Sequence, residues 1–137
     1  MILLDTNVLS ALMRREVDPI VVRWLDSQPS ESIWTTASTV FEVRFRLAIL
    51  ANGRRRNRLE LAFAKALNED FAGRVLSFDQ AAATAAALAA ERRRAGRPVD
   101  FRDVQIAGIA AARKASLATG NIRHFDGFGL DLINPWL

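Results

Sequence analysis

Hydrophobic residues along the 137-residue chain fall into two kinds of pattern. Short apolar or β-branched runs predict strands, and they cover residues 1–5, 32–38, 74–78, 115–119 and 130–133. Between them apolar residues recur at helical spacing, in stretches that follow residue 5, follow Pro19, and cover about 39–50, 59–71, 79–96 and 100–114. Strands that alternate with helices indicate an α/β fold, with a central, mainly parallel sheet of about four or five strands flanked by helices.

Polar residues stand where two of the predicted strands end. Asp5 follows the first apolar run, and Thr119 ends the fourth predicted strand. Ligands of parallel α/β sheets bind outside the carboxyl ends of the strands, so this edge is the expected place of a site. An aspartate after a strand is also a common cap of the next helix, so Asp5 taken alone leaves both interpretations open.

Glu42 is a second acid in apolar surroundings, within the segment TVFEVRFRL. On the predicted helix it shares a face with Phe45 and Ile49. Arg46 stands four residues later, and a surface Glu42–Arg46 pair worth about 0.3–0.5 kcal/mol explains the local pattern equally well. Glu42 is therefore a candidate site residue only in combination with other acids.

The segment GRPVDFRDVQIAG holds two aspartates three residues apart at the start of a predicted helix. Asp100 stands at the N-cap position after Pro98, where a carboxylate accepts hydrogen bonds from free backbone N–H groups. Asp103 heads a row that continues through Ile106 and Ala110, so it is expected to face inward. The alternative is that both acids only serve the positive end of the helix.

Three acids from three elements are thus expected near one edge of the sheet: Asp5, Glu42 and Asp103. Carboxylates brought together repel and raise one another's pKa, and a hard divalent cation removes that repulsion. Oxygen-only ligands favour Mg²⁺ or Mn²⁺ over Zn²⁺. The chain has no cysteine and a single histidine, His124, which we expect in a loop or at the surface rather than as a ligand.

Charge and composition add a basic excess of 19 Lys and Arg over 15 Asp and Glu, with clusters at 53–58 and 91–97. Such an excess suits a nucleic-acid partner, through counterion release, and equally serves solubility. Residues 1–10 lack the basic start and long apolar stretch of a signal peptide, and the alanine-rich run 81–90 is too short to span a bilayer. We expect a cytoplasmic protein without a membrane segment, which the absence of cysteine fits.

Six segments, in this order, resemble the PIN-domain ribonucleases of the VapC toxin type, especially the FitB-like branch. They are MILLDTNVLSAL, TASTVFEVRFRLAIL, FAGRVLSFD, GRPVDFRDVQIAGIAAA, LATGNIRHFDG and INPW. The resemblance covers most of the chain and implies a single PIN domain over residues 1–137, folded as a three-layer sandwich.

Carried over position by position, the resemblance implies that the catalytic acids are Asp5, Glu42 and Asp103. It implies that Asp5 and Asp103 hold Mg²⁺, or Mn²⁺, with Glu42 completing the shell or positioning the attacking water. The two clusters of basic residues are expected to follow the RNA backbone or to form solvated helix faces.

Supporting roles are expected for Thr6, Thr119 and Asn121, with the two threonines as hydroxyl donors or as helix caps. The fourth family motif reads Thr119-Gly120-Asn121, in which glycine replaces the usual arginine and Asn121 is the neutral variant of an acid. An amide carries no charge, so a second metal site is expected to be weaker, and the number of ions stays open.

The resemblance implies an Mg²⁺-dependent endoribonuclease, the toxin of a type II toxin–antitoxin module. Its implied partners are an RNA substrate, a cognate antitoxin of the VapB/FitA-like kind, operator DNA only through that antitoxin, and a second copy in a homodimer. The alternative function is that of a catalytically weak PIN-domain subunit, acting mainly in an antitoxin-mediated, DNA-bound repressor complex. Gly120 and Asn121 leave room for that alternative.

Overall fold

Five short parallel strands form the centre of the computed structural model, which describes residues 1–137. The strands are β1 (Ile2–Leu4), β2 (Ile33–Thr36), β3 (Val75–Leu76), β4 (Ser116–Ala118) and β5 (Leu132–Ile133). Their order in the sheet is β3-β2-β1-β4-β5, and every neighbouring pair is parallel. This arrangement confirms the predicted α/β fold with a central parallel sheet.

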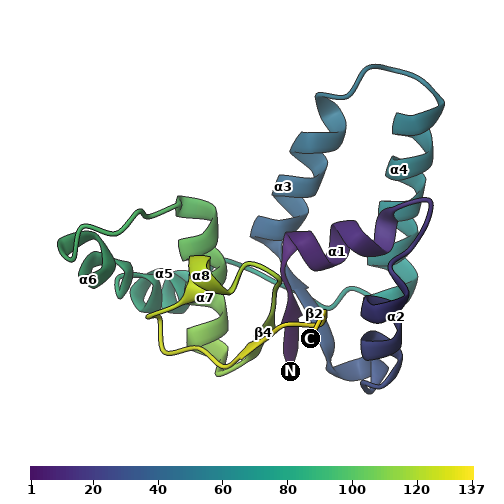
Figure 1. Ribbon diagram of the computed structural model, residues 1–137. Helices are drawn as coiled ribbons and strands as arrows, with labels where there is room; N and C mark the ends of the chain where they lie inside the picture. Colours follow the sequence, from purple (N-terminus) through teal and green to yellow (C-terminus); the bar gives the residue numbers. More distant parts are fainter.

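Helices cover both faces of the sheet and complete a three-layer sandwich (Figure 1). One face carries α1 (Thr6–Met13), α2 (Pro19–Asp26), α3 (Ala37–Ala48) and α4 (Arg54–Lys65), which continues as a π-helical turn over Ala66–Asp70. The other face carries α5 (Gln80–Ala86), α6 (Ala89–Arg94), α7 (Phe101–Arg113) and α8 (Ile122–Phe125). A 3₁₀ turn, Ser30–Ser32, precedes β2, and no helix is long and apolar enough to cross a membrane.

The strands are shorter than the predicted runs, α4 begins at Arg54 rather than near residue 59, and the structure departs from the sequence prediction at three further places. The predicted strand 32–38 ends at Thr36, because the Thr36 hydroxyl accepts from the backbone N–H of Thr39 and caps α3. The alanine-rich stretch forms two helices, α5 and α6, rather than one. The four-residue helix α8 was not predicted, since it is too short to show a periodic pattern.

Side chains on β1 alternate between the two layers of the core. Leu3 packs with Ile106 and Leu117 on the α7 face, and Leu4 packs with Val8 and Phe63 on the α1–α4 face. Both leucines are at most 1% exposed. Because β1 lies at the centre of the sheet and is covered on both faces, the residue that follows it has a fixed position.

Gly108 allows a close approach between α7 and α5. A Cβ atom at this position would lie 2.4 Å from the carbonyl oxygen of Ala82 and 2.7 Å from Cβ of Ala86. No side chain fits in that space without a shift of α5 backbone. The glycine therefore sets how deeply α7 sits against α5, and α7 carries Asp103 in its first turn.

Candidate active site

The candidate site lies at the carboxyl edge of the sheet, between β1 and β4. After β1 the chain builds β2 and β3 on one side, and it returns to place β4 and β5 on the other. The register pairs Leu4 with Ala118, so Asp5 and Thr119 leave neighbouring strands at the same level. The backbone N–H of Asp5 donates to the carbonyl of Ala118 at 2.9 Å. At such a switch point, where the strand order reverses although the strands stay parallel, a crevice opens in which α/β proteins bind ligands.

A pocket of about 170 Å³ occupies this crevice and has no hydrophobic residue in its lining. It is formed by Asp5, Thr6, Asn7, Glu42, Arg46, Asp100, Arg102, Asp103, Asn121 and His124. The pocket brings together the three predicted acids and two of the three predicted supporting residues. The third, Thr119, is fully buried beneath it, where its hydroxyl contacts Asp5.

Asp5 is buried and held by three donors. Its Oδ1 accepts from the backbone N–H of Thr6 at 2.8 Å, which caps α1. Its Oδ2 accepts from the Thr119 hydroxyl at 2.8 Å and from the Asn7 amide at 3.1 Å. Burial raises the pKa of Asp5 above its ordinary value, while the hydrogen bonds from Thr119 and Thr6 oppose that rise. Asp5 is thus both a helix cap and a carboxylate of the pocket.

Asp103 faces the same pocket from the first turn of α7. Its row continues through buried residues that include Ile106 and Ala110, as the spacing predicts. Burial, and then the charges of Asp100 and Asp5, raise the pKa of Asp103 to about 6. His124 Nδ1 lies 3.1 Å from Asp103 Oδ2 and acts in the opposite direction. Burial and the two neighbouring carboxylates thus disfavour the ionised form of Asp103 in the absence of a cation.

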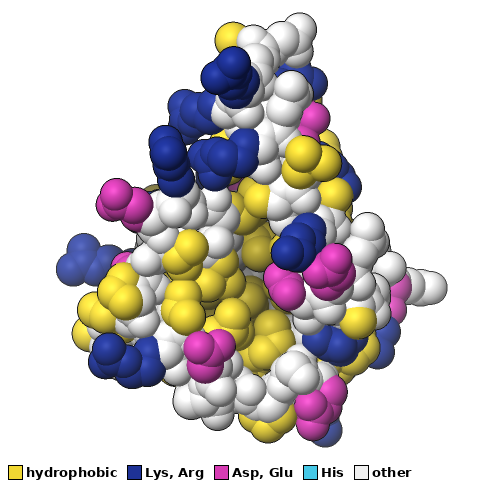
Figure 2. Space-filling model, turned by 90° about the vertical axis from the view of Figure 1, so that its right-hand side faces the viewer, with side chains coloured by type: hydrophobic (Ala, Val, Ile, Leu, Met, Phe, Trp, Pro, Cys, Tyr) yellow, Lys and Arg dark blue, Asp and Glu magenta, His cyan; other side chains and the backbone are white.

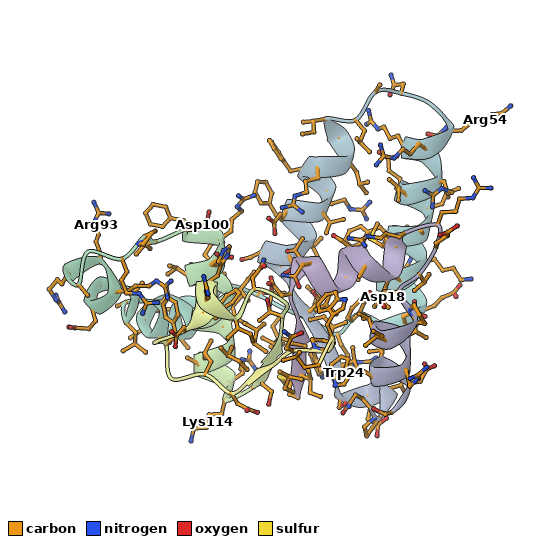
Figure 3. The ribbon with its side chains drawn as sticks, in the orientation of Figure 1. Asp18, Trp24, Arg54, Arg93, Asp100 and Lys114 are labelled. Atoms are coloured by element: carbon orange, nitrogen blue, oxygen red, sulfur yellow. The ribbon has the colours of Figure 1, made fainter.

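Asp100 performs the predicted capping role. Its Oδ1 accepts from the backbone N–H groups of Arg102 at 2.9 Å and Asp103 at 3.2 Å. Figure 3 shows Asp100 at the end of α7 that lies beside α3. Its side chain is half exposed, whereas that of Asp103 is 23% exposed. The two aspartates that look alike in the sequence therefore have different positions.

Glu42 reaches the pocket from α3 with both oxygens engaged. Its Oε1 accepts from Arg46 at 2.9 Å and forms an ion pair with Arg102, whose Nη1 lies 3.2 Å away, and its Oε2 accepts from the Thr6 hydroxyl. The pair with Arg46 that the sequence allows is present, yet Glu42 is buried and not a surface residue. Arg102, on α7, was not anticipated, because its contact depends on how α7 packs against α3.

Asn7 connects the two strand ends and was missed by the sequence prediction. Its side-chain amide donates to Asp5 Oδ2 at 3.1 Å and to the Thr119 hydroxyl at 3.3 Å. Its oxygen accepts from the backbone N–H of Gly120 at 3.0 Å. The sequence feature that could have predicted this role is the run Asp5-Thr6-Asn7. A polar side chain two residues after Asp5 can fold back to hydrogen-bond at the end of β1.

Asn121 and His124 complete the pocket from the β4–α8 segment. The backbone N–H of Asn121 donates to the Thr119 hydroxyl at 3.0 Å, and its side-chain amide makes no hydrogen bond. His124 is 57% exposed, as expected for a surface histidine, but its contact with Asp103 places it at the site. The unpredicted helix α8 explains why this contact was not foreseen.

The side chains of this pocket are compatible with a hard divalent cation held by few protein ligands. No three His, Asp or Glu side chains converge closely enough to enclose an ion. Asp5 and Asp103 nevertheless face one pocket without an arginine partner, whereas Glu42 holds two arginines. Mg²⁺ binds through one or two carboxylates and keeps several waters, so these two acids fit Mg²⁺ better than Zn²⁺.

Comparison with known proteins identifies relatives along the whole chain. The family model for the PIN domain matches residues 2–128. The VapC ribonuclease Y4jK of Sinorhizobium fredii is 43% identical over 141 residues, which cover 99% of this chain and 98% of the relative. Toxin FitB of Neisseria gonorrhoeae is 36% identical over 137 residues, with 99% of each chain covered. The solved structure of FitAB bound to an IR36 DNA fragment superimposes with a TM-score of 0.90 and 34% identity, covering 100% of this chain and 96% of that one.

Proposed function

Because this chain belongs to the PIN domain family, we propose that it is a metal-dependent endoribonuclease, the toxin of a type II toxin–antitoxin module. Its substrate in this proposal is RNA, and the reaction is hydrolysis of a phosphodiester bond. One full-length relative is named a ribonuclease and another a toxin, which supports both parts of the proposal. We further propose that residues 1–137 act as a single PIN domain.

The observation that carries the proposal is the pair Asp5 and Asp103 in one wholly polar pocket. The charge of Asp5 raises the pKa of Asp103, and burial raises the pKa of both. Two carboxylates placed where each disfavours the ionisation of the other are costly to fold, unless a cation shares them. The proposed ligands of Mg²⁺, or Mn²⁺, are therefore Asp5 and Asp103.

When bound, the divalent ion supplies a more acidic water and positive charge for the phosphate. The residues around the site fix the orientation of Asp5 and Asp103, the two carboxylates that would hold the ion. Thr119 and Asn7 hold Asp5 Oδ2 through neutral hydrogen bonds, which leave the carboxylate its charge. His124 orients Asp103 through its 3.1 Å contact with Oδ2. Asn121 presents an unbonded amide to the pocket, suited to orienting water or substrate.

Glu42 is the third proposed catalytic acid, and its arginine partners suggest how it takes part. In the free protein Arg46 and Arg102 occupy Glu42 Oε1. Both guanidinium groups are about half exposed, so an RNA phosphate can reach them and form the bidentate contact that arginine also makes with carboxylates. Transfer of the arginines to the phosphate would free Glu42 to position the attacking water, while Thr6 keeps its other oxygen in place.

The test is cleavage of structured RNAs by the purified protein, free of antitoxin, with Mg²⁺, with Mn²⁺ or with EDTA. We expect cleavage with either ion, none with EDTA, and a loss of at least about 10³-fold in Asp5→Asn and Asp103→Asn. Arg93→Ala on α6, outside the pocket, is the matched control and keeps full activity.

Cleavage that persists in EDTA or in both aspartate variants contradicts the mechanism. Absence of cleavage of any RNA by the wild-type protein favours the alternative, a catalytically weak subunit of a repressor complex. The side chains that support this alternative are Asn121, which carries no charge, and Glu42, which is neutralised by arginine.

The partner in this proposal is an antitoxin that covers the pocket. The solved relative is a FitAB complex bound to DNA, which supports an antitoxin that also contacts operator DNA. An arginine or lysine inserted between Asp5 and Asp103 would replace the metal charge and block the site. Co-expression with the cognate antitoxin should abolish cleavage, and DNA binding should require the complex.

A homodimer is the second assembly that we propose. The outer face of α3 exposes Phe41, Phe45 and Ile49, each more than half exposed, and the two rings contact each other with centroids 6.0 Å apart. An exposed apolar stripe of this kind on a helix is typical of a protein contact. Sedimentation should give a dimer for the wild type and a monomer for Phe45→Glu.

A further inference from the structure

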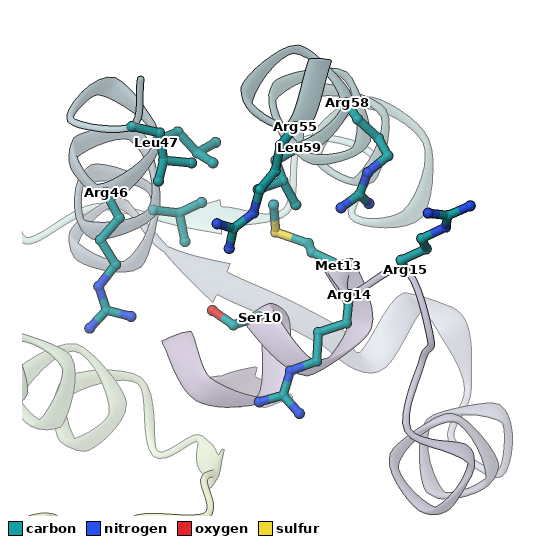
Figure 4. A pocket seen from close by; sticks show the side chains of 11 residues that line it. Ser10, Met13, Arg14, Arg15, Arg46, Leu47, Arg55, Arg58 and Leu59 are labelled. Atoms are coloured by element: carbon teal, nitrogen blue, oxygen red, sulfur yellow. The ribbon is translucent and has the colours of Figure 1, made fainter. Parts of the chain in front are cut away.

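A second pocket, which we call the arginine pocket, lies between α1, α3 and α4 (Figure 4). Its volume is about 390 Å³, more than twice that of the active-site pocket. Apolar side chains that include Val43, Leu47 and Leu59 form its floor. Its rim carries Arg14, Arg15, Arg46, Arg55 and Arg58, and no acid.

Four of these arginines have no partner within the protein. Arg14, Arg15, Arg55 and Arg58 form neither an ion pair nor a side-chain hydrogen bond, so their charge is available for a ligand. Arg92, in contrast, donates to three backbone carbonyls and holds α6 against the α8 segment. The rim of the arginine pocket is therefore a concentration of free positive charge rather than a structural network.

Basic side chains gather over one part of the face that carries α1, α2 and α4 (Figure 2). Figure 2 shows hydrophobic side chains gathered in a depression at the centre of this face, with Lys and Arg side chains above it. In Figure 4, Arg55 and Arg58 extend from α4 toward α1, and the Ser10 hydroxyl points into the space between them and α3. A ligand of this pocket must combine negative charge with a flat or apolar part.

Arg46 joins the arginine pocket to the active site, since it lines both. The helix α1 connects them too, because Thr6 at its start contacts Glu42, and Ser10 and Met13 further along line the arginine pocket. A polymer bound with one phosphate at the active site can thus continue along α1 into the arginine pocket.

We propose that the arginine pocket binds an unpaired nucleotide of the RNA substrate, next to the phosphate that is cleaved. The inference rests on the proposed ribonuclease function and names a subsite for it. The base lies on the apolar floor and against the guanidinium planes, and the flanking phosphates contact Arg55, Arg58 and Arg14. A base within a duplex is stacked and cannot enter, so the subsite selects single-stranded segments.

An acidic protein segment has complementary charge as well, but the connection through Arg46 favours RNA. The occupant of the active-site pocket in the proposed reaction is a phosphodiester, and its neighbouring nucleotides must lie somewhere along this surface. The arginine pocket is contiguous with it, concave and free of acids. A protein occupant is kept as an outcome of the test.

The test measures binding of a fluorescent twelve-nucleotide single-stranded RNA in an Asp103→Asn background, where cleavage does not interfere. We expect Arg55→Ala/Arg58→Ala to weaken binding about tenfold and to reduce the slope of log K against log salt by about 1.4, which corresponds to two phosphate contacts. The matched control is Arg23→Ala/Arg93→Ala, which removes two exposed arginines outside both pockets. The control should change the affinity less than twofold.

A second variant, Ser10→Trp, fills the pocket and keeps every charge. We expect it to weaken the binding of single-stranded RNA by a similar factor and to leave the affinity for duplex RNA unchanged. In the cleavage-competent protein, both pocket variants should raise KM for a long RNA. They should leave kcat/KM unchanged for a dinucleotide, which is too short to reach the subsite.

Affinity that is unchanged in both pocket variants overturns the proposal, and so does an equal loss in the arginine control. Loss of affinity for an acidic peptide alone, with RNA binding intact, would assign the pocket to a protein partner instead. If the wild type cleaves no RNA but binds it in the pocket, the proposed catalytic function fails and the subsite stands.

Discussion

The Thr119 hydroxyl donates a 2.8 Å hydrogen bond to Oδ2 of Asp5, across 114 residues of sequence. The two residues follow β4 and β1 directly, so the bond exists because these strands are neighbours in the sheet. It favours the ionised form of Asp5 against the burial that raises its pKa. The ionisation of Asp5, which cation binding requires, thus depends on Thr119, a residue distant in the sequence.

Replacement of Thr119 by valine keeps its shape and removes the donor. We expect Thr119→Val to raise the pKa of Asp5 further, to lower cleavage about tenfold near neutral pH, and to shift the acidic limb of the pH–rate profile upward. Thr119→Ser keeps the hydroxyl and should retain most of the activity. Profiles that coincide for the valine and serine variants would rule out this role.

The two aspartates of α7 should separate in the same cleavage assay. Asp100→Ser keeps a capping side chain, so its activity should be close to that of the wild type, whereas Asp103→Asn should be inactive. Asp100→Ala should lose about 1 kcal/mol of unfolding free energy without the activity loss of Asp103→Asn. If Asp100→Ser is as inactive as Asp103→Asn, the assignment of the pair is reversed.

Stability without metal should fall as the pH rises through the titration of Asp103. Its folded pKa of about 6 lies above the ordinary value of 3.8, so between these values the folded state holds the proton more tightly than the unfolded state. The free energy of unfolding therefore decreases from about pH 4 to pH 6 and then levels off. Burial of Asp5 acts in the same direction.

Asp103→Asn removes this dependence and should be more stable than the wild type at pH 7.5 by about 1–2 kcal/mol, a value discounted for partial exposure. Urea unfolding in EDTA at pH 4.5, 6 and 7.5 measures the difference, which should grow with pH and be smallest at pH 4.5. Parallel stability curves for the two proteins would contradict the shift.

The parts of the site that local pattern could predict are the ones each element specifies by itself. Asp5 follows from its place at the end of a continuous apolar run, and Asp103 from its place at the head of a row with the helical period of 3.6 residues. The cap at Asp100 depends only on its own backbone neighbours. These features can be predicted without knowing how the helices and the sheet pack together.

The remaining parts depend on how the layers pack. Arg102 meets Glu42 only because α7 lies beside α3, and His124 meets Asp103 only because a four-residue helix follows β4. The cluster of arginines at 53–58 contains two that line the arginine pocket and one, Arg56, that pairs with Glu60. No one-dimensional pattern distinguishes these, since the difference arises from the tertiary direction of each side chain.

Gly120, where the family motif usually has arginine, packs against Trp136 near the C-terminus. A Cβ atom at position 120 would lie 2.9 Å from Cζ3 of the indole ring. The ring is held in place by its N–H, which donates to Asp18 Oδ2 at 2.9 Å. A side chain at position 120 therefore requires the indole to shift, which disturbs its hydrogen bond to Asp18 at the N-cap of α2.

We expect Gly120→Ala to lower the free energy of unfolding by about 1–3 kcal/mol, the usual cost of overpacking. Trp136→Ala opens the space, so the double variant should lose less than the sum of the two single losses, with a coupling of at least about 0.5 kcal/mol in urea unfolding. Trp136→Phe keeps a ring without the bond to Asp18 and should show intermediate coupling. Strict additivity of the two single losses would mean that the glycine is not required by the indole, and Gly120→Arg would then be tolerated in this fold.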